Sequence, residues 1–233
     1  MASFWSQGGA TVSVSVVSHG HDAWLPGLLA DLARHGTSVV RQVLITHNLP
    51  AADLPEGDWP FELVQIHNPR PLGFGANHNR AFAQAQGPFF CVLNPDIRIT
   101  QNPFPALVQA CSDNGVGITA PTIHNSSGQL EDSARKFPSP WRIAHRVLTR
   151  RRTRDYPAPS TALHPDWVAG MFMLLRSPVY QQMGGFDERY FLYYEDVDLC
   201  ARIRLAGLDI VQLPLPGVVH DAQRASHRNP TYL

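Results

Sequence analysis

The sequence feature that most constrains the fold is a continuous apolar run at residues 89–93, Phe-Phe-Cys-Val-Leu. Such a run is typical of a strand that is buried on both faces of a sheet. Strand-like and helix-like segments alternate around it, which predicts an α/β fold with a mostly parallel central sheet flanked by helices. The expected strands are residues 11–17, 39–46, 61–67, 89–93, 117–120, 167–175 and 209–213, and the expected helices begin near Trp24 or cover 75–86, 103–112 and 195–207.

Length and composition narrow the class of protein. With 233 residues, 44% of them hydrophobic, the chain is expected to form a single domain over residues 1–233. The formal net charge is zero, and no nucleic-acid partner is expected. Cys91, Cys111 and Cys200 lie far apart in apolar contexts, which favours reduced core residues in a cytoplasmic protein. Neither a secretion signal nor an apolar run of about 18 residues is evident, so secretion and membrane spanning are not expected.

Polar residues follow four of the expected strands. Ser18 follows the first, Asn48 the second, residues 68–79 the third, and Asn94 and Asp96 the fourth. Because the carboxyl ends of parallel strands share one edge of a sheet, and such sheets bind ligands there, these residues are expected to form one rim around a ligand.

The stretch from Gly184 to Cys200 carries a second signal. Apolar spacing after Val197 predicts a helix that begins near Glu195 and ends near Gly207, where glycine accepts the left-handed conformation. Carboxylates of Glu195, Asp196 and Asp198 therefore crowd the first turn of this helix.

Two interpretations of this acidic cluster are open. The carboxylates can simply cap the helix and complement its dipole, at about 0.3–1 kcal/mol each. Alternatively, one carboxylate lies against an apolar wall formed by Phe191, Tyr193 and Tyr194, which would raise its pKa and allow it to accept a proton.

Several motifs in this order resemble those of family 2 glycosyltransferases, closest to the rhamnosyltransferase-like branch, over about residues 12–222. The Gly184–Cys200 stretch is similar to the Glu-Asp motif of that family, and the resemblance makes Asp196 the general base. Asn94-Pro95-Asp96 resembles a version of the Asp-x-Asp motif that helps to hold a divalent cation on the donor diphosphate. The resemblance therefore implies that Asp96 and His220 bind Mg²⁺ or Mn²⁺, although Asp96 alone is more often a turn residue.

Further site residues follow from the same resemblance. Gly73, Asn77 and Arg80 belong to a Gly-x-Gly segment that packs beside the nucleotide in the family, although the glycines can equally serve close helix packing. Arg135 is the candidate for contact with phosphate. The implied nucleotide-sugar-binding residues are Ser18, Asn48, Gly73, Asn77, Arg80, Asn94, Asp96 and Arg135, and the implied acceptor-binding residues are Trp167, Gly170 and Glu195.

The resemblance implies a single GT-A domain with a nucleotide-sugar-binding half at about residues 11–100 and an acceptor-binding, catalytic half at about 101–222. The implied reaction is an inverting, metal-assisted transfer of rhamnose from dTDP-rhamnose to a hydroxyl of a growing bacterial surface glycan or lipid-linked glycan. One motif departs from the family: residues 45–50 lack the Asp that reads the base, where His47 or Asn48 could still hydrogen-bond a pyrimidine edge. The competing hypothesis is a catalytically degenerate GT-A-fold binding module.

Residues 141–154 combine basic and apolar side chains. Six arginines lie between Arg142 and Arg154, and Trp141 heads an apolar side. This pattern predicts peripheral contact with an anionic membrane, at the inner face of the cell membrane, because each basic residue near such a surface is worth about 1 kcal/mol. A solvated loop is the alternative.

Overall fold

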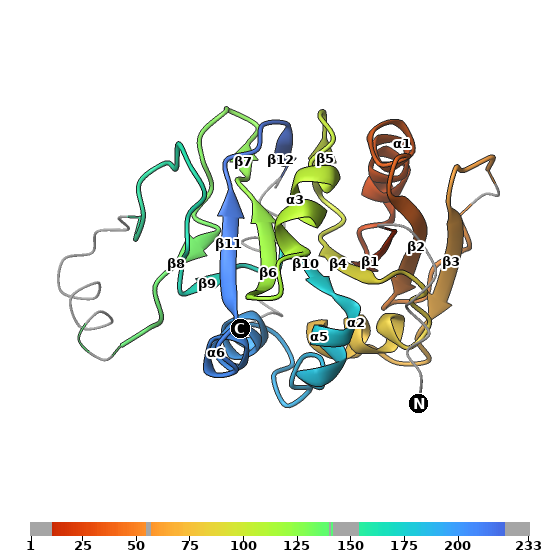
Figure 1. Ribbon diagram of the computed structural model, residues 1–233. Helices are drawn as coiled ribbons and strands as arrows, with labels where there is room; N and C mark the ends of the chain where they lie inside the picture. Colours follow the sequence, from red (N-terminus) through yellow and green to blue (C-terminus); the bar gives the residue numbers. More distant parts are fainter. Residues whose placement is uncertain (1–10, 55–56, 140, 142–153, 222–233) are drawn as a thin grey trace.

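The computed structural model describes residues 11–54, 57–139, 141 and 154–221 (Figure 1). Its centre is a seven-stranded sheet in the order β11-β6-β10-β4-β1-β2-β3. All neighbouring strands in it run parallel except β10, which is antiparallel to β4 and β6. The mostly parallel sheet predicted from the sequence is confirmed. The large-sheet strands are β1 (Val12–Ser18), β2 (Val40–His47), β3 (Glu62–His67), β4 (Phe89–Leu93), β6 (Val116–Pro121), β10 (Phe172–Arg176) and β11 (Asp209–Leu213).

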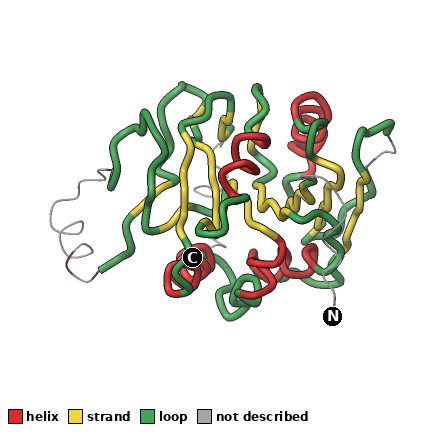
Figure 2. The backbone as a smooth tube through the Cα atoms, viewed as in Figure 1, coloured by secondary structure: helices red, strands yellow, loops and turns green. Residues whose placement is uncertain are grey.

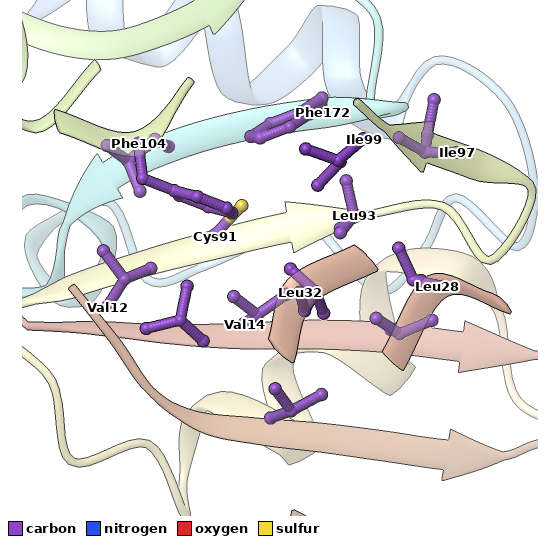
Figure 3. Close-up of a cluster of buried hydrophobic side chains, with 14 of the residues drawn as sticks. Val12, Val14, Leu28, Leu32, Cys91, Leu93, Ile97, Ile99, Phe104 and Phe172 are labelled. Carbon is purple, nitrogen blue, oxygen red and sulfur yellow. The ribbon is translucent and has the colours of Figure 1, made fainter. Parts of the chain in front are cut away.

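Helices cover both faces of this sheet (Figure 2). They are η1 (Asp22–Trp24), α1 (Leu25–His35), α2 (Phe74–Phe82), α3 (Phe104–Cys111), α5 (Ser177–Gln182) and α6 (Glu195–Leu205). Alternate residues of β4 face opposite layers. Cys91 and Leu93 pack with side chains of α1 and α3 (Figure 3), whereas Phe90 and Val92 pack with those of α5 and α6. The apolar run at 89–93 is thus a strand without an exposed face, as its composition predicted.

Two small sheets complete the fold. β5 (Ile97–Ile99), β12 (Val218–His220) and β7 (His124–Asn125) form one, and β8 (Ala134–Arg135) with β9 (Trp167–Val168) forms the other. The expected single strand at 167–175 is wrong, because β9 leaves the large sheet to pair with β8 and only β10 pairs with β4. The expected helix 75–86 ends at Phe82, and α5 was not predicted.

The segment expected to contact a membrane lies mostly outside the described residues. Only Trp141 and Arg154 of that segment are described, and Trp141 is exposed. Within the described ranges, the helices are too short or too polar to cross a bilayer.

Candidate active site

The first turn of α6 is held by an uncommon backbone conformation. Tyr193 and Tyr194 both have a left-handed φ, 70° and 71°, just before the helix begins at Glu195. Such a conformation costs roughly 1–3 kcal/mol for a residue other than glycine, and it recurs at ligand sites. The helix ends as expected, with Gly207 at a φ of 76°.

Backbone donors hold both oxygens of Asp196. Its Oδ2 accepts the N–H of Gly170 at 3.1 Å and its Oδ1 accepts the N–H of Val197 at 2.8 Å. Burial raises the pKa of Asp196, while these hydrogen bonds and the positive charge of Arg135 oppose that rise. The side chain is therefore fixed in direction, and its affinity for a proton exceeds that of an ordinary aspartate.

Glu195 is the more deeply buried member of the pair. It is 5% exposed, and its Oε2 has no hydrogen-bond partner among the described residues. Burial raises its pKa to about 7, and the charge of Asp196 adds to that rise. Helix α2 comes close to this side chain, because a Cβ placed on Gly75 would lie 3.8 Å from the Cβ of Glu195.

Of the aromatic wall expected beside the carboxylates, Tyr193 and Tyr194 line the same cavity as Glu195 and Asp196, whereas Phe191 does not line it. Phe191, Tyr193 and Tyr194 are 63%, 61% and 59% exposed, so they cannot be the main cause of the burial of the carboxylates. Tyr193 and Tyr194 combine a left-handed backbone with exposed side chains, whereas Glu195, the first residue of α6, is buried.

A cavity of about 470 Å³ opens at the N-terminus of α6. Arg135 lies over the ring of Trp167, 5.6 Å from its centroid, and forms an ion pair with Asp132 at 2.9 Å. The indole N–H of Trp167 donates to the carbonyl of Lys136 at 3.0 Å, which fixes the ring. The lining residues are Arg135, Lys136, Pro138, Asp155, Trp167, Tyr193, Tyr194, Glu195, Asp196 and Val197.

Four predicted residues therefore share this cavity, and Gly170 reaches it through its N–H bond to Asp196. A Cβ on Gly170 would lie 3.1 Å from the ring of Phe74, so this glycine also lets α2 approach. Lys136 was not among the predicted site residues. It is the only lysine of the sequence, and its position beside Arg135 was the signal that could have identified it.

At the rim of β1, β2 and β3, the predicted residues bind one another. The side chain of Asn68 donates to Oδ1 of Asn48 at 2.8 Å and to Oδ1 of Asn77 at 2.5 Å. The amide of Asn77 donates in turn to the carbonyls of Leu72 and Gly73, and Arg80 donates to Asn68 at 2.6 Å. Their expected contact with a nucleotide stays a prediction, since in this structure these bonds hold the loop before α2.

Ser18 and His47 lie below this rim. Ser18 is 1% exposed, and its hydroxyl donates to Asp22 at 2.8 Å. His47 is also buried, bonded to Gln65 at 3.1 Å and stacked on His67. Neither side chain reaches the surface of this structure.

The two glycines of the Gly-x-Gly segment pack against the chain before α6. A Cβ on Gly73 would lie 2.6 Å from the carbonyl oxygen of Phe191, and one on Gly75 would lie 2.5 Å from the Cβ of Phe186. Close packing is therefore an observed role of both glycines, and contact of Gly73 with a nucleotide stays a prediction.

The predicted metal ligands are brought together by the pairing of β5 with β12. Nε2 of His220 lies 3.1 Å from Oδ2 of Asp96, and Glu131 is 3.9 Å from the other ring nitrogen. Burial by itself lowers the pKa of His220. The hydrogen bond to Asp96 and the negative charges of Asp96, Glu131 and Asp221 outweigh this effect, so the pKa is raised overall. Asn94 lies at the end of β4, where its N–H donates to the carbonyl of Met171 at 2.9 Å.

These two side chains fit a divalent cation that is shared with another ligand. Among the residues that the structure describes, Oδ1 of Asp96 and Nδ1 of His220 are buried without hydrogen-bond partners, and carboxylate oxygen with imidazole nitrogen suits Mn²⁺. The described ranges contain no group of three or more side chains able to hold a metal by themselves. Oxygens of a bound diphosphate would have to complete the coordination.

The sequence matches the family described as "Glycosyltransferase like family 2" over residues 46–229, more than half of the chain. It is 32% identical over 188 residues to the N-acetylglucosaminyl-diphospho-decaprenol L-rhamnosyltransferase of Mycobacterium tuberculosis, a match that covers 68% of this chain and 59% of that protein. It is 27% identical over 226 residues to the rhamnosyltransferase WbbL of Escherichia coli, covering 91% and 83%.

Solved structures show the same fold. A crystal structure of GalNAc-T7 with UDP, GalNAc and Mn²⁺ superposes with a TM-score of 0.70 at 14% identity, covering 91% of this chain and 44% of that one. The chain thus spans about 59% of the first relative and 44% of this structure.

Proposed function

Since the chain belongs to glycosyltransferase family 2, we propose that it transfers a sugar from a nucleoside diphosphate donor to a hydroxyl group of a glycan. The observation that carries this proposal is the placement of Asp196 and Arg135 in one cavity. A carboxylate that can accept a proton and a cation that can face a diphosphate are the two charges that such a displacement requires.

Asp196 is the general base of the proposed reaction. The acceptor oxygen attacks the anomeric carbon, its proton passes to Asp196, and the bond from that carbon to the diphosphate breaks. A single displacement of this kind inverts the anomeric centre. The N–H groups of Gly170 and Val197 keep the carboxylate oriented, and burial raises its pKa toward the working pH.

Glu195 binds the acceptor in this proposal. With a pKa raised to about 7, Glu195 retains a proton far more readily than an ordinary glutamate, and the protonated carboxyl can donate a hydrogen bond to an acceptor oxygen. Its pKa near the working pH also makes it a second candidate for the base. Trp167 offers an apolar face at the same cavity.

Asp96 and His220 are the residues that would hold Mg²⁺ or Mn²⁺ together with the donor diphosphate. A bound cation would supply charge neutralisation for the leaving group. Arg135 adds a second positive charge, and its bond to Asp132 keeps it in place before the donor arrives.

The proposed donor is dTDP-rhamnose and the proposed acceptor is a lipid-linked surface glycan at the cytoplasmic face of a bacterial membrane. Two similar proteins carry the name rhamnosyltransferase, and one of these names specifies a diphospho-decaprenol acceptor. Peripheral contact through Arg142–Arg154 remains part of this proposal, on the sequence pattern alone.

Calorimetric titration tests the donor site. We expect dTDP to bind at least about tenfold more tightly with Mn²⁺ than without it, because Asp96 and His220 alone offer little charge to a hard cation. Asp96→Ala should remove the metal effect. His164→Ala, which breaks a different histidine–aspartate pair with Asp209, is the matched control and should keep it. Equal affinity with and without metal would rule out the metal site.

A transfer assay tests the reaction itself. Wild-type protein with dTDP-rhamnose and Mn²⁺ should release dTDP and label a lipid-linked glycan acceptor. A degenerate binding module would bind the nucleotide, raising the melting temperature, but release no dTDP.

A further inference from the structure

Five consecutive large side chains precede α6 and are all exposed. This aromatic loop consists of Tyr190, Phe191, Leu192, Tyr193 and Tyr194. It belongs to the connection between α5 and α6, which runs along the lower edge of the molecule in Figure 1. Large apolar side chains have about 150–250 Å² of surface each, so their exposed fractions leave several hundred Å² uncovered. Patches of this size on a monomer are often functional.

The backbone of the aromatic loop is held in place. The carbonyl of Phe191 accepts the N–H of Phe74 at 2.9 Å, and Gly73 packs directly beneath it. Tyr193 and Tyr194 adopt the left-handed conformation, which costs stability, and both side chains are exposed. The backbone that carries these exposed apolar side chains is therefore fixed, and two of its residues have an energetically unfavourable φ.

The chemistry of the loop favours a lipid surface. Residues 190–194 contain no charged side chain, and tyrosines flank the purely apolar pair Phe191 and Leu192. Tyrosine is enriched where membrane meets water, whereas phenylalanine and leucine enter the acyl boundary. The exposed area falls short of the roughly 800 Å² per partner that a stable protein interface buries, so a second protein fits less well.

The loop is also continuous with the catalytic cavity. Tyr193 and Tyr194 line that cavity beside Asp196, and Phe191 and Leu192, which directly precede them in the chain, are not among its lining residues. We infer that the aromatic loop docks on the surface of a lipid bilayer, with Phe191 and Leu192 inserted at the acyl boundary. This inference rests on the proposed function in that a lipid-linked acceptor would then meet Asp196 from the membrane side.

Sedimentation with vesicles of neutral phosphatidylcholine in high salt tests the inference. Neutral lipid and high salt suppress electrostatic attraction between basic residues and the membrane. Any binding that remains must come from insertion of apolar side chains. The 233-residue chain should sediment with the vesicles, and the double variant Phe191→Ser, Leu192→Ser should bind at least about tenfold more weakly. Leu205→Ser, which removes an equally apolar and more exposed side chain at the far end of α6, is the matched control and should bind like wild type.

Several outcomes would overturn the inference. They are equal binding by wild type and the double variant, binding to anionic vesicles alone that salt abolishes, and concentration-dependent self-association that the double variant loses. Titration of dTDP with Mn²⁺ on the same double variant should give wild-type affinity, which shows that the variant is folded. If wild type binds vesicles but no nucleoside diphosphate, the proposed function fails while the docking surface stands.

Discussion

The rim of β1, β2 and β3 and the cavity at α6 both bury polar side chains, but they treat them differently. At the rim, the amides of Asn48, Asn68 and Asn77 bond to one another and to backbone carbonyls. At the cavity, Oε2 of Glu195 is buried without a hydrogen-bond partner in the described part of the chain, and the preceding turn is in an unfavourable conformation. The amide network of the first region is a satisfied scaffold, although Nδ1 of the neighbouring His47 is buried without a hydrogen-bond partner among the described residues. The second region places its unpartnered atom in the cavity itself, and there the cost is uncompensated.

This difference separates residues that hold the site from residues that can act in it. An unpartnered buried polar atom costs about 1–3 kcal/mol, and a left-handed non-glycine residue costs a similar amount. Strained residues and unpartnered buried groups cluster at active sites and ligand-binding sites, where the strain can serve function. We therefore expect variants at the cavity to change turnover or its pH dependence, and variants at the rim to change stability.

The largest effect is expected for Asp196→Asn. The amide cannot take a proton, so kcat for transfer should fall by about 10²–10⁴-fold while donor affinity stays within a few-fold of wild type. Transfer rate and calorimetric affinity are the measurements. Asn can accept only one of the two backbone N–H bonds, so a stability loss of about 1–3 kcal/mol should accompany the change.

Asp198→Asn is the matched control for this change. Asp198 lies in the same helical turn but bonds to Arg202 at 2.7 Å, and it does not line the cavity. Its substitution should leave kcat near that of wild type. Near-normal transfer by Asp196→Asn, measured below its melting temperature, would reduce Asp196 to a helix-capping residue and make Glu195 the candidate base.

Glu195→Gln should stabilise the protein in a pH-dependent way. Its pKa is raised from 4.5 to about 7, so the folded state binds more protons than the unfolded state between those values. Wild-type stability should therefore fall as pH rises from about 4.5 to about 7, by about 3 kcal/mol at most. The neutral amide escapes this loss, so the variant should be more stable than wild type at pH 8 and about equally stable at pH 4.5.

Urea unfolding at these two pH values measures the difference. Asp198→Asn serves again as the reference. It removes a carboxylate from the same helix, but Asp198 is less deeply buried than Glu195. A stability difference between Glu195→Gln and wild type that does not change with pH would show that Glu195 ionises normally in the folded protein. In transfer, we expect Glu195→Gln to raise KM for the acceptor and to cost less in kcat than Asp196→Asn.

Local sequence pattern was sufficient to predict the layers of this fold. The apolar run at 89–93 and the helix from Glu195 to Gly207 have strong, short-range signals, and both were confirmed within two residues. The grouping of Arg135, Trp167, Glu195 and Asp196 came instead from family resemblance. Nothing in the periodicity of residues 134–168 indicates that β8 and β9 meet beside α6.

Features that depend on tertiary packing were beyond the sequence. The break between β9 and β10 has no proline to mark it, and β9 is drawn away by its pairing with β8. Glu195 is buried and α2 comes close to it at Gly75, whereas the sequence pointed to the aromatic loop. The pairing of β5 with β12, which joins Asp96 to His220, links residues more than a hundred positions apart.

The smallest effects are expected at the rim, where Asn77→Ala tests whether the amides are scaffold. The substitution removes the acceptor for Asn68 and two bonds to backbone carbonyls, so the free energy of unfolding should fall by about 1–3 kcal/mol. Arg80→Ala, which removes an exposed partner of the same Asn68, should change the free energy of unfolding by under about 0.5 kcal/mol.

Urea unfolding and titration with dTDP are the measurements. If Asn77 acts only through the loop, nucleotide affinity should change by no more than a few-fold once the folded fraction is taken into account. A loss of affinity of a hundredfold with unchanged stability would instead make Asn77 a direct ligand of the nucleotide, and the contrast between a satisfied rim and a reactive cavity would no longer hold.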